Sequence, residues 1–148
     1  MNKILFIISW SVILTLVLTA CGAPAAADPV TVVENYYDAL TASDLEKAMS
    51  FFADDAVYLD QMARISGKED IRAWLQGLID TGQSYEVSDL TNTNGRLEYK
   101  IKVSVNDRQV YSGLAVTVVK DGKIIFDGTK ALWDAECNRD ASLPFCAD

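Results

Sequence analysis

The chain has 148 residues, contains no histidine and carries a formal net charge of −8 at neutral pH. This length corresponds to one ordinary domain. An acidic surface repels the phosphates of nucleic acid, so nucleic-acid binding is not expected. The absence of histidine removes the commonest zinc ligand, and no acidic or cysteine cluster has metal-ligand spacing. We therefore expect neither a metal nor a cofactor.

The N-terminus has the features of an export signal. Lys3 supplies a positive charge, and a nearly uninterrupted apolar run follows over residues 4–18. This run has about 15 residues, whereas a membrane-spanning helix needs about 20. The pattern predicts a cleaved signal peptide over residues 1–20.

Leu18-Thr19-Ala20-Cys21 resembles the lipobox of bacterial lipoproteins, in which the cysteine is diacylated before the signal is cut in front of it. The resemblance implies lipid, palmitate included, on Cys21 and a tether over residues 21–27. It also implies an extracytoplasmic protein anchored to the cell membrane or outer membrane. The alternative is a secretory signal cut after Ala27, which would discard Cys21 and release a soluble protein.

Two further cysteines, Cys137 and Cys146, lie near the C-terminus. An exported protein meets an oxidising environment in which disulfides persist, so we expect these two cysteines to pair. The alternative is two free thiols. A catalytic cysteine is not expected, because the chain has no histidine to act as its base.

Three helices are predicted in the first part of the domain. Asp28 is a typical N-cap residue, and Pro29 suits the first position of a first helix. Residues 43–46 and 66–69 each have the serine and glutamate of a capping box, which predicts that a second and a third helix begin there. Gly82 is expected to end the third helix.

The hydrophobic period changes to two from residue 85 onward. Residues 96–105 alternate between apolar and charged, which is typical of an antiparallel strand with one buried face. Residues 110–119 are apolar on both faces and predict a central strand. Asp121-Gly122 predicts a tight hairpin into a last strand over residues 124–133. With a short strand at residues 56–60, the pattern predicts an α+β domain with a curved sheet.

Four segments resemble the nuclear-transport-factor-2-like superfamily, and within it the SnoaL-like polyketide cyclases and the ketosteroid isomerases; they are Val32 to Tyr36, Ala42 to Leu45, Phe51 to Ala56 and Ser66 to Ile71. The resemblance covers residues 28–133. It implies a cone-shaped curved antiparallel sheet wrapped around three N-terminal helices, with an internal pocket. Residues 134–148 would form a C-terminal tail that holds the disulfide. Such a fold hosts enzymes, binding proteins and dimerising modules alike.

The isomerase branch implies two catalytic candidates. It places a tyrosine on the first helix as oxyanion donor and an aspartate at the end of the first strand as base, which correspond here to Tyr36 and Asp60. The acid that completes the oxyanion hole should fall within residues 113–116, where this chain offers Leu114 or Ala115. Because loss of one such donor typically costs about 100- to 1000-fold in rate, steroid isomerase activity is not expected.

Tyr58 and Asp60 lie two residues apart on one strand and therefore share one face. The resemblance implies that this face lines the cavity. It also implies four further lining residues: Trp74, Tyr99, Ala131 and Trp133. Each aromatic residue among them could instead belong to the ordinary core.

The sequence thus predicts an extracytoplasmic, lipid-anchored domain that binds a small, mostly apolar ligand oriented by Tyr36, Tyr58 and Asp60. One alternative is an isomerase- or cyclase-like enzyme that uses Asp60 for proton transfer next to a carbonyl. Another is a protein-interaction module with a vestigial pocket. Relatives often dimerise through the outer sheet face, so a homodimer is a possibility that the sequence leaves undecided. The charged residues on one face of the 96–102 segment favour a solvent-exposed surface or a polar interface.

Overall fold

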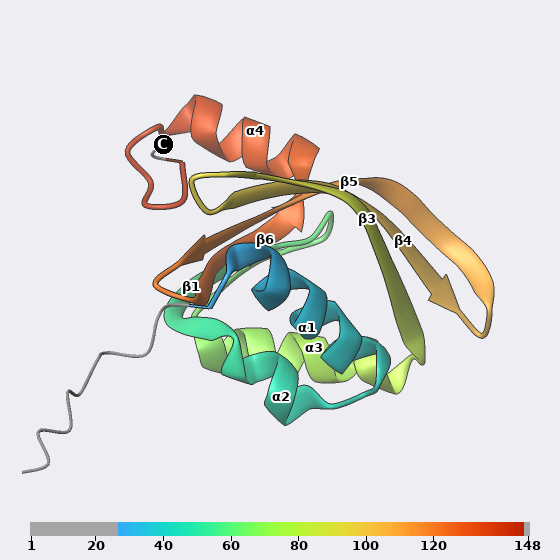
Figure 1. Cartoon of the computed structure of the whole chain (residues 1–148). Coiled ribbons are helices and arrows are strands. Elements are labelled where there is room, and N and C mark those ends of the chain that lie inside the picture. The colour runs from blue at the N-terminus through green and yellow to red at the C-terminus, as the bar shows by residue number, and fades with distance from the viewer. Residues whose placement is uncertain (1–26, 147–148) are drawn as a thin grey trace, which may run out of the picture.

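The computed structural model describes residues 27–146 (Figure 1). The predicted signal peptide and lipid site, Cys21, lie outside the described residues. Across residues 27–146, no helix has both the length and the hydropathy that crossing a bilayer requires. The elements in chain order are α1 (Pro29–Thr41), α2 (Leu45–Ser50), β1 (Phe52–Leu59), β2 (Arg64–Ser66), α3 (Lys68–Asp80), β3 (Gln83–Thr93), β4 (Arg96–Val105), β5 (Arg108–Lys120), β6 (Lys123–Thr129) and α4 (Lys130–Arg139).

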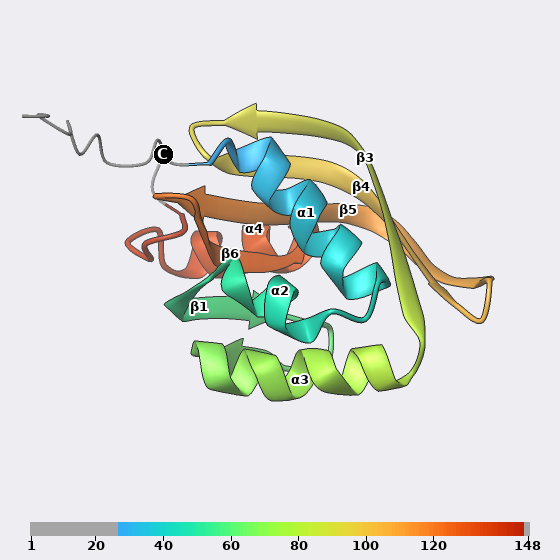
Figure 2. The same cartoon turned by 60° about the horizontal axis from the view of Figure 1, so that its bottom comes forward.

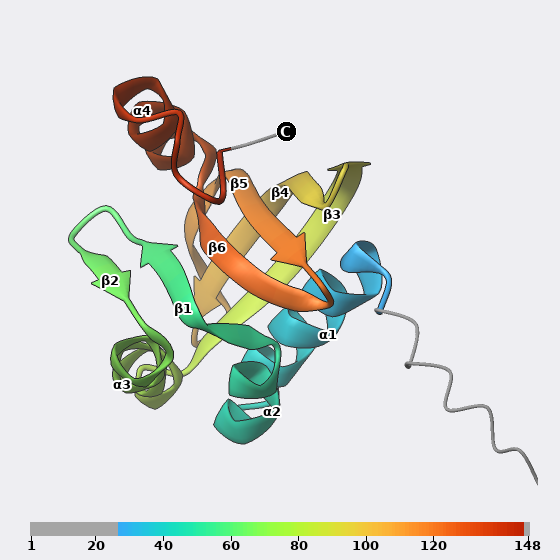
Figure 3. The same ribbon diagram turned by 90° about the vertical axis from the view of Figure 1, so that its left-hand side faces the viewer.

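The strands form one curved, unclosed sheet in the order β2-β1-β6-β5-β4-β3. Neighbouring strands are antiparallel except β1 and β6, which run parallel. That pair can be parallel because most of the domain lies between the two strands in the chain and provides the crossover. The sheet arches around α1, and α3 lies beside β1 and β2 (Figures 2 and 3). The predicted α+β architecture with a curved sheet is confirmed.

Helix α1 fills the hollow of the sheet. It begins as predicted, because the Asp28 carboxylate accepts a hydrogen bond from the Thr31 backbone N–H at 3.1 Å and Pro29 follows the cap. Its inward face carries buried side chains at helical spacing, which include Val33, Tyr36 and Leu40. Full burial of side chains of this size contributes about 1.5–3 kcal/mol each, so α1 is held mainly by its contact with the sheet.

The two predicted capping boxes are wrong in detail. Helix α2 is capped by Asp44, whose carboxylate accepts from the Lys47 N–H at 3.0 Å, because Ser43 occupies the left-handed region at φ 58°. Ser66 cannot cap α3, since it is the last residue of β2 and pairs with β1. Gly67 precedes α3 instead, at φ 92° and with no side-chain cap.

The hairpins follow the sequence pattern closely. Strand β4 has the predicted bounds, and the turn after it places Asn106 and Asp107 at φ 49° and 61°. Asp121 and Gly122 likewise adopt φ 52° and 74° in the turn between β5 and β6. Two successive positive φ values are what a two-residue hairpin turn requires, because they match the twist of the flanking strands.

The predicted last strand, however, is too long. Strand β6 ends at Thr129, whose hydroxyl accepts from the Leu132 N–H at 3.4 Å and caps α4. Residues 130–139 are therefore helical and leave the sheet. Figure 3 shows α4 on the convex side, opposite α1.

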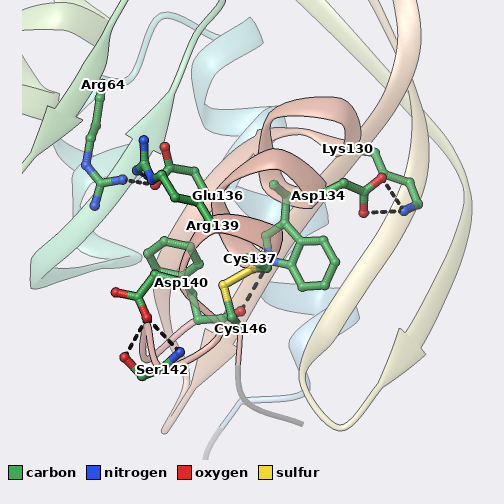
Figure 4. Close-up of a disulfide and its surroundings, with 11 residues drawn as sticks. Arg64, Lys130, Asp134, Glu136, Cys137, Arg139, Asp140, Ser142 and Cys146 are labelled. Carbon is green, nitrogen blue, oxygen red and sulfur yellow. Dashed lines mark hydrogen bonds and ion pairs between the residues drawn. A yellow bond between two sulfur atoms is a disulfide. The ribbon is translucent and has the colours of Figure 1, made fainter.

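Helix α4 and the C-terminal segment cover an outer cluster on the convex face, whose buried members are Val57, Leu59, Val116, Val118, Phe126 and Phe145. Trp133 packs against this cluster and donates its indole N–H to the Phe145 carbonyl at 3.2 Å. Cys137 and Cys146 form a disulfide with a Cα–Cα distance of 5.4 Å (Figure 4). An ion pair between Arg64 and Glu136 ties α4 to β2. The disulfide thus holds the segment that carries Phe145 against α4.

We predict that replacing both Cys137 and Cys146 by serine lowers the free energy of unfolding by about 2–3 kcal/mol, because the unfolded chain loses a closed loop of about ten residues. Urea unfolding of the two proteins measures the difference. In a chain that begins after Cys21, no thiol should react before reduction. Two reactive thiols in the unreduced protein would contradict the pairing.

Candidate functional site

A cavity of about 360 Å³ opens between the concave face of the sheet and the C-terminal ends of α1 and α3. Leu40 and Leu78 contribute from the two helices, and the rest of the wall comes mainly from the sheet. Met62 and Val110, which are 87% and 58% exposed, lie at its rim. The volume falls in the range of sites for small molecules.

Tyrosines dominate the wall. Five of them reach it from α1, β1, β3 and β5: Tyr36, Tyr37, Tyr58, Tyr85 and Tyr111. Aliphatic side chains fill the spaces between them, and the acidic residues of the wall are Asp60 and Asp127. The wall is thus largely apolar, with hydroxyl and carboxylate groups at a few positions.

Asp127 lies at the centre of a buried hydroxyl network. It is 1% exposed and accepts hydrogen bonds from the hydroxyls of Thr117 at 2.7 Å and Tyr36 at 3.1 Å. The hydroxyls of Tyr37 and Tyr99 donate to it at 3.2 and 3.3 Å. The Tyr99 oxygen also lies 2.9 Å from the Tyr37 hydroxyl and 2.6 Å from the Thr117 hydroxyl, and each hydroxyl has one proton to share among these contacts. Because a carboxylate has about four acceptor sites, this network saturates Asp127.

Burial dominates the titration of this network. It raises the pKa of Asp127 above the ordinary value for an aspartate, and the hydroxyl hydrogen bonds oppose this shift. Burial, and after it the charge of Asp127, raises the pKa values of Tyr36, Tyr37 and Tyr99 well above their usual range. The three tyrosines therefore remain protonated hydrogen-bond donors at neutral pH.

The structure separates the two residues that the resemblance paired for catalysis. The Tyr36 hydroxyl donates to Asp127 on the floor of the cavity. Asp60 lies in the wall near the rim, where its carboxylate accepts from the Met62 backbone N–H at 2.9 Å. Tyr58 and Tyr85 line the same cavity as Asp60. Burial, and after it the charge of Asp127, raises the pKa values of both tyrosines, and the charge of Asp60 adds to this shift.

The other predicted lining residues lie elsewhere. Tyr99 is buried below the cavity floor, within the Asp127 network. Trp74 does not line the cavity but a separate depression between β2 and α3. The prediction that Ala131 and Trp133 line the cavity is wrong. Both belong to α4 on the convex face, because Thr129 ends β6.

Sequence reasoning missed Asp127, although two signals marked it. It is a lone acid that follows the apolar residues Ile124 to Phe126. The resemblance implied that Ala131 and Trp133 line the cavity, and in a strand over residues 124–133 alternation would put residue 127 on the same face as these two. Leu114 is 51% exposed and does not line the cavity, whereas Ala115 does, so no acid comes from that part of β5.

The sequence of the domain matches a known protein family. The model of the SnoaL-like domain matches residues 33–126, which include the helices and strands that form most of the cavity wall. The chain belongs to the SnoaL-like domain family. No curated protein matches the sequence of this SnoaL-like domain significantly.

Solved structures share the fold of this SnoaL-like domain. A nuclear-transport-factor-2-like protein from Cytophaga hutchinsonii has 12% identity and a TM-score of 0.61, with 68% of this chain and 87% of that chain covered. A candidate polyketide cyclase from Sinorhizobium meliloti has 24% identity and a TM-score of 0.61, with 69% and 98% covered. A candidate ketosteroid isomerase from Kribbella flavida has 19% identity and a TM-score of 0.60, with 68% and 74% covered. At these identities the likeness establishes the fold alone.

We predict that Asp127→Asn lowers the free energy of unfolding by about 1–3 kcal/mol, because the amide nitrogen donates where hydroxyl donors need an acceptor. A raised pKa in the folded state means that the folded protein holds the proton more tightly than the unfolded one. The contribution of Asp127 is therefore greatest below the unfolded pKa of about 3.9 and decreases as pH rises through the folded-state pKa.

Urea unfolding at pH 4 and pH 7 tests the prediction. The stability gap between the native protein and Asp127→Asn should be smaller at pH 7 than at pH 4. Asp55→Asn, on an exposed residue of β1, is the control for loss of one charge. A stability difference that increases with pH would show that the hydroxyl hydrogen bonds lower the pKa of Asp127 by more than burial raises it.

Proposed function

We propose that this SnoaL-like domain binds a small, mostly apolar molecule in its cavity, outside the cytoplasm. The observation that carries the proposal is the cavity of about 360 Å³, with its tyrosine and aliphatic wall. Sites for small molecules typically combine such a wall with a few polar groups that orient the ligand. Tyr58 and Asp60 are the orienting groups nearest the rim.

The saturated state of Asp127 supports binding rather than catalysis. A general base must reach the proton that it removes and must have a free acceptor site for it. The bonds from Tyr36, Tyr37, Tyr99 and Thr117 occupy the acceptor sites of Asp127. The cavity also remains open although several aromatic side chains surround it, which argues against a vestigial pocket.

Isomerase- or cyclase-like proton transfer is the second candidate function, and the presence of Asp60 beside Tyr58 in the cavity wall favours it. In this role Asp60 would be the base, and Tyr36 would have to leave Asp127 to donate to an oxyanion. Exchange of the α-protons of a bound ketone in deuterated water, seen by NMR and lost in Asp60→Asn, would establish this function in place of simple binding.

We also propose that lipid on Cys21 anchors the domain to a membrane. The sequence of the lipobox supports this, and the position of the cavity is compatible with it. The tether would join the domain at the start of α1, whereas the cavity opens near Leu40, close to the other end of this helix. Since a helix of 13 residues is about 20 Å long, Leu40 in the cavity wall lies far from the start of α1.

Filling the cavity tests the binding proposal. Val103 lines the cavity from β4, and Val103→Trp should exclude a molecule that co-purifies with the native protein from its own membrane, as measured by mass spectrometry. Lys102→Trp is the matched control, because Lys102 is exposed and, as the residue before Val103 in β4, points to the opposite face of the sheet. Retention of the same molecule by Val103→Trp would contradict binding in this cavity.

The anchoring proposal predicts that Cys21→Ser accumulates as unprocessed precursor and loses labelling by a radioactive or alkyne-tagged fatty acid. The reason is that the signal is cut only after the cysteine is diacylated. Gel migration and acyl labelling in the producing cell measure both effects. Normal processing of Cys21→Ser after Ala27 would sink the proposal.

A further inference from the structure

We propose that the ligand of the cavity carries a positive charge and is an organic ammonium ion attached to a small apolar body. The inference rests on the proposed binding function and names the ligand class for the same cavity. It follows from the charges of the wall, the state of Asp127 and the arrangement of the tyrosines.

The wall has negative charge and no positive charge to balance it. It contains Asp60 and Asp127, and no lysine or arginine is among the described residues that line the cavity. The chain has no histidine. A cavity with low-dielectric walls and charge of one sign focuses its field on whatever enters. An anionic ligand is therefore repelled, and a cation is attracted.

Asp127 is a buried carboxylate without a basic partner in the described part of the chain. Its partners are the hydroxyls of tyrosines and a threonine, which stabilise the charge by dipoles and do not neutralise it. Buried carboxylates are usually paired with a cation or protonated. A cationic ligand above the cavity floor would supply a countercharge and favour the ionised form of Asp127 over the protonated form.

Tyr58 and Tyr85 line the cavity together with the two carboxylates. Burial, then the charge of Asp127 and to a smaller extent that of Asp60, raises the pKa values of both tyrosines. Tyr111 adds a third aromatic ring to the wall and lies over Gly113, where a Cβ atom would come within 2.3 Å of its hydroxyl. Tyrosine rings attract ammonium groups by their negative faces, and quaternary ammonium ions are typically bound in this way.

A neutral apolar ligand fits this wall less well than a cation. It would use the aliphatic side chains, but it would leave Asp60 and Asp127 without countercharge and remove water from Asp60. An ammonium ion uses the same aliphatic surface for its apolar body and places its charge between the tyrosines. The placement of Asp60 at the rim also favours capture of a cation from solvent.

Three probes of similar size separate these cases: benzyltrimethylammonium, its uncharged carbon isostere neopentylbenzene, and the anion phenylmethanesulfonate. Binding is followed by NMR shifts of the amides of β1 and β3. We expect the ammonium ion to bind about tenfold more tightly than the isostere. The sulfonate should not bind at the same concentrations.

Variants locate the effect. Asp60→Asn keeps an oxygen that can accept from the Met62 N–H but loses the charge, and it should weaken binding of the ammonium ion about five- to tenfold without changing that of the isostere. Asp55→Asn removes the same charge from an exposed residue outside the cavity wall and should change neither. Tyr85→Leu should weaken binding of the ammonium ion, and Tyr85→Phe should restore most of it.

Equal or tighter binding of neopentylbenzene would overturn the inference and leave the proposed binding function intact. Equal losses in Asp60→Asn and Asp55→Asn would overturn it too, because only the overall charge would then matter. Failure of all three probes would also overturn it. The proposed binding function is judged separately, by whether Val103→Trp loses the co-purified molecule.

Discussion

The buried carboxylate of Asp127 is the constraint on which the cavity depends. It connects α1, β4, β5 and β6 through four hydroxyl groups. A carboxyl group at this depth is stable only when hydrogen bonds replace its lost water, so the side chains of all these elements must be in place together. The floor of the cavity is consequently a fixed surface, and the rim near Asp60 and Met62 is its exposed part.

The two faces of the sheet are covered by different parts of the chain. The concave face holds α1 and the cavity, whereas the convex face is covered over β1, β5 and β6 by α4 and the C-terminal segment. The disulfide keeps Phe145 within the outer cluster. The remaining convex surface carries ion pairs such as Lys100 with Asp89 and Lys102 with Glu86. A homodimer that used this face would have to build a polar interface beside α4.

The fold of the SnoaL-like domain is shared widely, but its chemistry depends on the side chains that line the cavity. This chain has no acidic residue at positions 114 and 115, which are Leu114 and Ala115. It has a buried acidic residue at Asp127, whose carboxylate accepts hydrogen bonds from several hydroxyl groups. It also lacks positive charge in the described cavity wall. These features are side chains and not backbone, so the shared fold does not specify them.

Local patterns in the sequence determined much of the architecture, because caps, turns and alternation depend on residues close together in the chain. Asp28-Pro29, Asp121-Gly122 and the alternation of residues 96–105 specified their elements correctly. The end of β6 did not follow from such a pattern. Thr129 ends the strand and caps α4, whereas the sequence pattern predicted a strand that continues to residue 133. Only the tertiary structure decided that Ala131 and Trp133 leave the cavity face.

The site shows the same division. Sequence spacing placed Tyr58 and Asp60 on one face, since a strand has a period of two. The partner of Tyr36 could not be inferred in this way, because Asp127 is 91 residues away and meets it only when α1 lies in the hollow of the sheet. The composition of the cavity wall, with two carboxylates and no cation among its described residues, likewise arises from packing seven elements together. Long-range packing, which no local pattern encodes, therefore decided the chemistry of the cavity.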